Sequence, residues 1–208
     1  RLQHTRVPGV GIMIYRLYEK ILLRNLSTLP EHICFMISEK DMLDAPDNLY
    51  RTVEWCRELG IRSVTFHIST ADPSRLERCL PQIRRVSSIA HLRLHYREET
   101  EVAGEGMDVT VAIGKSGREE IAACIRRMAE EGVEPDSVNE ELLESYLTFR
   151  YEPDLVIKTG GDHLTDFLIW QSVYSELFFL DVNWALLRKV DFLRALRDFQ
   201  SRVRRFGR

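Results

Sequence analysis

Four short loops carry the residues of this 208-residue chain whose types and spacing are suited to chemistry. Each loop follows an apolar run of strand length and is rich in hydroxyl, charged or glycine residues; the loops are residues 38–41, 69–72, 114–118 and 158–163. In the last of them, Lys158 precedes Thr159-Gly160-Gly161, and a cation beside a glycine turn is suited to binding a phosphate group. These residue types are compatible with a phosphate-binding loop. An equally good interpretation of the same turn is a plain connection between a strand and a helix.

The elements that must position these loops alternate between strand and helix along the chain. Apolar runs predict strands at residues 33–37, 61–68, 91–96, 109–113, 155–157 and 178–181, with a charged, glycine-containing loop at 97–106. Apolar residues at helical spacing predict helices at 13–26, 44–60, 117–131, 140–147, 167–174 and 191–205, with a further helix after Pro73. The predicted fold is a single α/β domain with a mainly parallel central sheet of about six strands flanked by helices. Ligands of such sheets bind at the carboxyl ends of the strands, where the four loops lie.

Composition is that of an ordinary globular protein. Of the 208 residues, 44% are hydrophobic and 29% are charged, which is enough for one substantial core. A formal net charge of −3 gives no reason to expect nucleic-acid binding, although eight arginines and lysines gather between Arg188 and Arg208. The first twelve residues precede Met13 and are expected to be an upstream extension or an expression remnant, so the predicted domain spans residues 13–208.

Cysteine spacing and hydropathy favour an intracellular protein. Cys34, Cys56, Cys79 and Cys124 show neither a CxxC pair nor a Cys/His metal pattern, so we expect reduced, structural thiols. No apolar run reaches the roughly 18 residues that a transmembrane helix requires, and the first residues lack the apolar region of a secretory signal. We therefore expect a cytoplasmic location.

Two neighbouring segments carry a resemblance to a known family. The run Asp154-Leu155-Val156-Ile157-Lys158-Thr159-Gly160-Gly161-Asp162 is followed by Phe167-Leu168-Ile169-Trp170-Gln171 and by Tyr174-Ser175-Glu176-Leu177-Phe178-Phe179. This order resembles the carboxyl-terminal signature of the cis-prenyltransferases, the undecaprenyl and dehydrodolichyl diphosphate synthases. Upstream, Arg118-Glu119-Glu120-Ile121 and Pro30-Glu31-His32 are similar to further elements of that family. The resemblance covers nearly the whole chain from Met13 onward and implies the fold of the family.

The departures from the family pattern fall at the phosphate-binding loops. Catalytic members end the first strand in Asp-Gly-Asn, whose Asp helps to bind Mg²⁺ and diphosphate, whereas this chain has Ser38 in the Asp position. Only sixteen residues separate Ser38 from Trp55, fewer than in catalytic members. An asparagine of the family becomes Asp72, the arginine before Thr-Gly-Gly becomes Lys158, and a second phosphate-binding arginine has no counterpart. The resemblance thus implies no catalytic residue and no metal site in this chain, and it places Mg²⁺ in a catalytic partner.

The parts that the family uses for dimer formation are retained. The resemblance assigns the subunit interface to six side chains: Phe167, Trp170, Gln171, Tyr174, Glu176 and Phe178. It also implies that Arg205, Phe206 and Gly207 reach the partner's active site and help to bind isopentenyl diphosphate there. The chain therefore resembles a non-catalytic subunit of the Nogo-B receptor type, in an archaeal form without a membrane anchor. We expect it to form a heterodimer or heterotetramer with a catalytic cis-prenyltransferase that makes long-chain polyprenyl diphosphate from isopentenyl diphosphate and an allylic diphosphate.

Other hypotheses remain open at the level of sequence. One is an active homodimer in which Asp41 or Asp72 replaces the missing aspartate; another is a protein that only binds polyprenyl diphosphates or docks the synthase to other proteins. Arg205 and Gly207 are also compatible with a plain solvated helix end. The amphipathic helix at 13–26 could give peripheral membrane contact, although such apolar stripes more often pack in a core or an interface.

Overall fold

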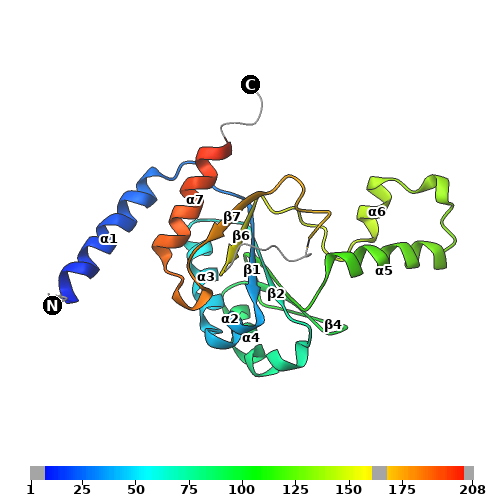
Figure 1. The fold of residues 1–208 in the computed structure, drawn as a ribbon, viewed down its shortest axis with the longest axis horizontal. Helices are drawn as coiled ribbons and strands as arrows, with labels where there is room; N and C mark the ends of the chain where they lie inside the picture. Colours follow the sequence, from blue (N-terminus) through cyan, green and yellow to red (C-terminus); the bar gives the residue numbers. More distant parts are fainter. Residues whose placement is uncertain (1–7, 161–167, 204–208) are drawn as a thin grey trace, which may run out of the picture.

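A seven-stranded sheet forms the centre of the molecule (Figure 1). The computed structural model describes residues 8–160 and 168–203 of the chain. The strands lie in the order β4-β3-β5-β2-β1-β6-β7, and all neighbours are parallel except β3 and β4. Their bounds are β1 His32–Ser38, β2 Ser63–Ser69, β3 His91–Tyr96, β4 Glu99–Ala103, β5 Asp108–Ile113, β6 Leu155–Thr159 and β7 Glu176–Leu180. The predicted α/β fold with a mainly parallel sheet is confirmed.

Strand β4 is the one that the sequence does not predict. It lies within residues 97–106, so the expectation of a loop there is wrong. Arg97 has a φ of 52° and turns the chain back after β3, and β4 then pairs antiparallel with β3. Most β4 side chains are exposed because β4 is an edge strand. Charged residues are common at sheet edges because they discourage pairing with other chains. An edge strand can therefore have the charged composition of a loop, which is why the sequence pattern predicts a loop here.

One face of the sheet packs against helices, whereas the apolar cluster on the other face takes its non-strand members from turns and loops. The bounds of the helices are α1 Pro8–Asn25, α2 Glu39–Asp44, α3 Asp47–Glu58, α4 Leu80–Arg84, α5 Gly117–Glu130, α6 Glu140–Tyr146 and α7 Lys189–Val203, with 3-10 helices η1 Pro73–Cys79, η2 Arg85–Ser88, η3 Pro135–Ser137 and η4 Trp184–Leu186. Helix α1 begins at Pro8, upstream of the expected start at Met13, and proline is favoured in the first turn of a helix. None of the helices within the described ranges has the length and apolar character that a membrane crossing needs.

The helix expected at residues 167–174 is not present in the part that the structure describes. Residues 168–174 form turns instead. Leu168 has a φ of 53°, in the left-handed region that a right-handed helix excludes. Gln171 is buried and its side-chain amide donates to the carbonyl of Phe149, so tertiary contacts hold this segment in its turns.

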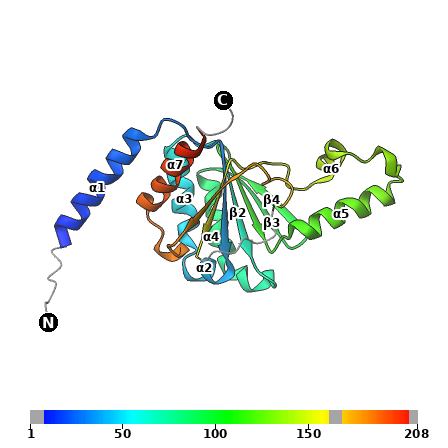
Figure 2. The same cartoon turned by 45° about the horizontal axis from the view of Figure 1, so that its top comes forward.

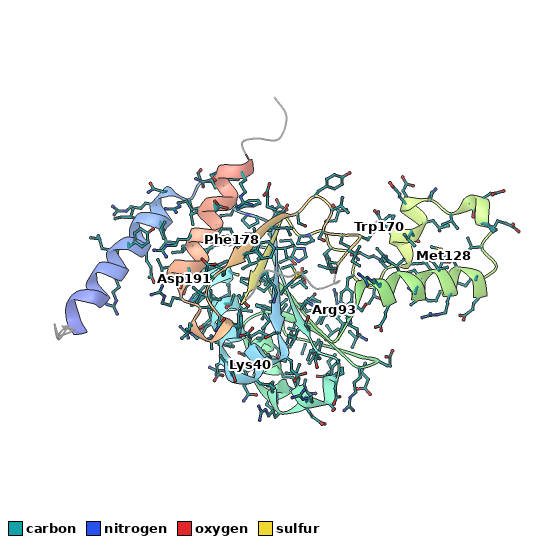
Figure 3. All side chains as sticks on the ribbon, in the orientation of Figure 1. Lys40, Arg93, Met128, Trp170, Phe178 and Asp191 are labelled. Carbon is teal, nitrogen blue, oxygen red and sulfur yellow. The ribbon has the colours of Figure 1, made fainter. Side chains whose placement is uncertain are left out.

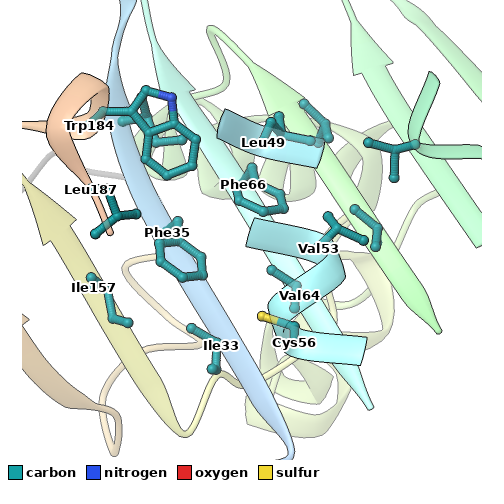
Figure 4. Close-up of a cluster of buried hydrophobic side chains, with 14 of the residues drawn as sticks. Ile33, Phe35, Leu49, Val53, Cys56, Val64, Phe66, Ile157, Trp184 and Leu187 are labelled. Atoms are coloured by element: carbon teal, nitrogen blue, oxygen red, sulfur yellow. The ribbon is translucent and has the colours of Figure 1, made fainter. Parts of the chain in front are cut away.

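The larger part of the core lies between the sheet and helices α3, α4 and α7. Phe35 of β1 and Phe66 of β2 stack with their ring centroids 5.3 Å apart, and Trp184 meets each of them edge-on at 6.2 Å (Figure 4). The side chains of β1 are buried on both faces of the sheet, as is usual for a central parallel strand. This double burial explains the continuous apolar runs from which the strands are predicted.

Two helical segments project from the body at opposite ends (Figures 1 and 2). Helices α5 and α6 form an arm at one end, and α1 extends at the other, with its second half beside α7.

The side chain of Gln200 in α7 holds the segment of chain that follows α1. Its Oε1 accepts from the N–H groups of Ser27 and Thr28 at 2.6 and 3.1 Å, and its Nε2 donates to the carbonyl of Asn25 at 3.1 Å.

The other face of the sheet carries a smaller apolar cluster together with buried histidines. His95 of β3 is buried there, with its ring 4.8 Å from that of Phe149 and its Nδ1 3.0 Å from the Thr100 hydroxyl. Burial lowers the pKa of His95 to about 4, and the nearby charges of Arg93 and Lys115 act in the same direction. Burial also lowers the pKa of His32.

The buried histidines predict that the protein loses stability in mild acid. The folded-state pKa of His95 lies below the value of about 6.5 in an unfolded chain, so between these values the unfolded state binds more protons. The free energy of unfolding should fall by about 2 kcal/mol from pH 7 to pH 5 because of His95 alone. Urea unfolding at both pH values checks this. His95→Gln should reduce the difference, and an undiminished pH dependence in His95→Gln would show the assignment to be wrong.

Candidate functional site

The carboxyl edge of β1, β2 and β6 brings three of the predicted loops together. Strand β1 lies between β2 and β6, and Ser38 pairs in register with Ser69. The loops at 38–41, 69–72 and 158–160 therefore meet at the edge where parallel sheets bind their ligands. The loop at 114–118 begins beside them, because a side-chain carbon on Gly114 would lie 3.3 Å from the carbonyl of Thr70. Gly161 to His163 lie outside the described residues.

The residues after β1 form the helix α2 and not the expected loop. Ser38 is its N-cap: its hydroxyl accepts from the Asp41 N–H at 3.1 Å and donates to the Asp41 carboxylate at 2.6 Å. A serine cap of this kind stabilises a helix by about 1 kcal/mol. The Ser-x-x-Asp spacing is a helix-start signal that could have revealed α2 in the sequence. The Ser38 hydroxyl is thus engaged in starting a helix.

The carboxylates at this edge have partners within the chain. Glu39 accepts from the Thr70 hydroxyl at 2.5 Å and forms an ion pair with Arg75 at 2.8 Å. Asp72 caps η1 by accepting from the N–H and the hydroxyl of Ser74 at 3.0 and 2.6 Å, and these bonds lower its pKa. The sequence gives no indication of the Glu39–Arg75 pair, because the two residues belong to different segments.

Lys158 and the glycine turn after β6 lie beneath α2 and η4. Lys158 is buried and its Nζ donates to the carbonyl of Thr159 at 3.1 Å. Burial lowers the pKa of Lys158, and the charge of Asp41 opposes this shift. Gly160 has a φ of 60°, and a side-chain carbon there would lie 3.1 Å from Oδ1 of Asn183 and 3.5 Å from Oδ2 of Asp41. The backbone conformation therefore favours glycine at this position, and a side-chain carbon would also crowd the Asn183 side chain.

Two cavities lie on either side of the loop between β5 and α5. One of 610 Å³ lies between the β3–β4 hairpin and α5, and one of 710 Å³ lies over the ends of β2 and β5. They share Lys115, Ser116 and Glu119, and charged and polar side chains dominate both linings. Neither cavity offers an apolar lining to a long apolar ligand. On the opposite face of the sheet, the space beneath α3 and α4 is filled by buried core side chains.

The side chains expected at a subunit interface have different environments. Tyr174 is 86% exposed, and Trp170 lies toward the arm, where its Nε1 donates to Glu144 of α6 at 3.2 Å (Figure 3). Phe178 of β7 packs partly against the main core, and Gln171 is buried. Phe167 lies outside the described residues. Among the described members of this set, Tyr174 is the most exposed.

Glu176, the acidic member of that set, anchors the end of α7. Arg202 of α7 forms an ion pair with the Glu176 carboxylate at 3.3 Å and donates to the carbonyl of Leu177 at 3.0 Å. Arg202 is a residue that sequence reasoning missed, since nothing in its local pattern indicates a contact with β7. The residues Arg205, Phe206 and Gly207 that follow lie outside the described part of the chain.

Comparison with known proteins identifies the family of this chain. The sequence model of the family described as putative undecaprenyl diphosphate synthase matches residues 78–207. The chain is 32% identical to an isoprenyl transferase of Deinococcus radiodurans over 99% of this chain and 96% of the relative. It is 30% identical to the tritrans,polycis-undecaprenyl-diphosphate synthase (geranylgeranyl-diphosphate specific) of Methanocaldococcus jannaschii, over 94% of this chain and 89% of the relative. The chain therefore belongs to the cis-prenyltransferase (undecaprenyl diphosphate synthase) family.

Solved structures agree with this fold. A probable undecaprenyl diphosphate synthase from Campylobacter jejuni matches with a TM-score of 0.68 and 23% identity, over 88% of this chain and all of the other. Lavandulyl diphosphate synthase from Lavandula x intermedia matches with a TM-score of 0.67 and 18% identity, over 83% of this chain and 95% of the other. At these identities the likeness extends to the fold alone.

The chain is shorter than its sequence relatives within the aligned region. The alignment to the Deinococcus radiodurans protein runs over 267 residues, more than the 208 of the whole chain, so that relative has segments that this chain lacks. This agrees with the short connection between Ser38 and Trp55.

The described residues at this edge do not fit a resident Mg²⁺, the ion that the family implies. Mg²⁺ in proteins is held by carboxylate and phosphate oxygens. Here the Ser38 hydroxyl caps α2, Glu39 is held by Arg75, and Asp72 caps a helix. Within residues 8–160 and 168–203, no group of three or more His, Cys, Asp or Glu side chains is arranged to hold a metal ion.

The anchor at the end of α7 gives a testable prediction. Glu176→Gln removes the ion pair with Arg202, so amide hydrogen exchange in the last turn of α7 should become roughly two- to fivefold faster. The matched control is Glu58→Gln, which removes the ion pair with Lys189 at the first turn of the same helix. Its effect should be confined to that first turn. Equal exchange in the last turn of wild type and Glu176→Gln would contradict the proposed anchor.

Proposed function

We propose that this chain is a non-catalytic subunit of a heteromeric cis-prenyltransferase. Its partner would join isopentenyl diphosphate to an allylic diphosphate, forming a carbon–carbon bond and a cis double bond and releasing pyrophosphate and a proton. Repetition of this step would give long-chain polyprenyl diphosphate. The observation that carries the proposal is Ser38, which stands in the position of the family's catalytic aspartate and uses its hydroxyl to cap α2.

The charges at the carboxyl edge support a non-catalytic role. Glu39, Asp41 and Asp72 gather where a diphosphate would have to bind, and the cations near them are Lys40, Arg75, Arg97 and Lys158. Unit charges about 4 Å apart interact by roughly 4 kcal/mol at an effective dielectric constant of 20. Repulsion of this size opposes the binding of a multiply charged diphosphate.

Exposed apolar side chains support contact with a catalytic subunit. Val173 and Tyr174 are 68% and 86% exposed, and Phe179 on the edge strand β7 is 43% exposed. Val173 and Tyr174 are adjacent in the turn that precedes β7, and exposed large apolar groups are typical of a protein–protein interface. In the proposed complex, Arg205 and Gly207 help to bind isopentenyl diphosphate in the partner's active site, and the partner holds Mg²⁺.

The names of the relatives favour a second candidate function, in which this chain itself is a prenyltransferase. The Deinococcus radiodurans relative is named an isoprenyl transferase, and the name of the Methanocaldococcus jannaschii relative specifies geranylgeranyl diphosphate. An active homodimer would use Asp41 or Asp72 in place of the missing aspartate. A protein that only binds or docks polyprenyl diphosphates is the third candidate.

Incorporation of labelled isopentenyl diphosphate separates these functions. The assay contains Mg²⁺ and geranylgeranyl diphosphate, with this chain alone, with a catalytic family member from the same source, or with both copurified. We expect activity well above that of the catalytic chain alone only in the copurified complex. Arg205→Ala should then reduce turnover at least tenfold without dissociating the complex, because it removes a charge-assisted hydrogen bond. Turnover by this chain alone would establish the second candidate and exclude the non-catalytic role.

Helix α1 supports a further proposal of peripheral membrane contact. Leu17 and Ile21 are 61% and 47% exposed, and Arg16, Lys20 and Arg24 are nearby on the helix. Apolar side chains beside basic ones suit the surface of an anionic bilayer.

Vesicle flotation tests this membrane contact. The protein should float with vesicles that contain anionic lipid and much less with neutral ones, because both the basic and the apolar side chains contribute. Leu17→Ser/Ile21→Ser should reduce flotation severalfold. Ile125→Ser/Val138→Ser, which removes exposed apolar side chains from the arm, is the matched control. Equal flotation of the two double variants would exclude α1 as the contact.

A further inference from the structure

The carboxylate of Asp41 has a fixed position above the glycine turn that follows β6. Its Oδ2 accepts from the Ser38 hydroxyl at 2.6 Å, and its own N–H donates back to that hydroxyl at 3.1 Å. The Asp41 carbonyl accepts from the N–H of Ala45 at 3.1 Å, so the backbone of this residue is also held within the turn of α2. The hydrogen bonds on side chain and backbone together hold the carboxylate in one place.

The turn beneath this carboxylate has the features of an anion site. Gly160 presents bare backbone with a φ of 60°, and the nearest groups above it are Oδ1 of Asn183 and Oδ2 of Asp41. Lys158, at the end of β6 and two residues before Gly160, is buried, and a buried cation needs a negative charge nearby to be stable. In a phosphate-binding turn the ligand supplies that charge. In this chain the Asp41 carboxylate, next to Gly160, already supplies a negative charge at this turn.

We propose that Asp41 is an internal anion that occupies the place of a phosphate group over the Lys158–Gly160 turn and keeps the turn closed to phosphorylated ligands. This inference rests on the proposed function, because a subunit that leaves catalysis to its partner does not need a diphosphate here. It also assigns a specificity role to a residue that sequence reasoning considered only as a replacement catalytic carboxylate. Neutralising Asp41 should therefore create affinity for an inorganic anion.

Asp41→Asn is the change that isolates the charge. Asparagine has nearly the same shape, and its side-chain carbonyl can still accept from Ser38. Calorimetric titration with inorganic pyrophosphate, in the presence of a chelator so that no Mg²⁺ contributes, should show at least tenfold tighter binding to Asp41→Asn than to wild type. Adding Lys158→Met to Asp41→Asn should abolish the gain, because the cation of the turn is then missing.

Asp44→Asn is the matched control, since it neutralises another carboxylate of α2. Asp44 pairs with Lys40 at 2.6 Å on the exposed side of the helix, so this variant should bind pyrophosphate as weakly as wild type. Asp41→Ser repeats the test with a smaller neutral side chain, and circular dichroism establishes that each variant is folded.

Three results would overturn the inference: wild type that binds pyrophosphate as tightly as Asp41→Asn, equally weak binding by both folded Asp41 variants and wild type, or a gain that survives Lys158→Met. The titration contains neither a partner chain nor a prenyl substrate. Its outcome is therefore independent of the incorporation assay, and failure of the internal anion can be told apart from failure of the non-catalytic role.

Discussion

The arrangement of the whole carboxyl edge depends on how β1 is held between β2 and β6. The carboxylate of Asp154, just before β6, accepts from the N–H groups of Glu31 and His32 at 2.7 and 2.9 Å and so fixes where β1 begins. Side chains alternate between the two faces of a strand, so a slip of one residue would turn Phe35 out of the aromatic core. The same slip would move Ser38 away from its place at the edge. One pairing register thus determines both the packing and the meeting of the loops.

The parts of the fold that could be predicted are those in which local sequence and burial agree. The central strands β1 and β2 are buried along most of their length because both of their faces are covered, and their apolar residues reveal them in the sequence. Strand β4 is not predicted from the sequence, because an edge strand can contain charged residues and then lacks an apolar pattern. The segment after Leu168 is misjudged for the opposite reason: its apolar spacing suits a helix, but the buried contact between Gln171 and Phe149 holds it in turns.

The location of the candidate site could be predicted from the sequence, but the contacts between its residues could not. Lys158 and Gly160 are recognisable because a glycine turn follows a buried strand, and the family resemblance that they support is confirmed by the comparisons. The non-catalytic role stays a proposal. The neighbours of the turn come from distant segments: Asn183 lies above Gly160. Long-range proximity of this kind leaves no periodic signal in a single sequence.

Helix α7 joins the two ends of the described chain through contacts only two residues apart. Gln200 holds the segment that follows α1, and Arg202 holds β7 through Glu176. A continuous α-helix is stiff over such a distance, so it passes on a displacement that a loop would absorb. A load applied at the last turn of α7 is therefore shared between the sheet edge and the carboxyl end of α1.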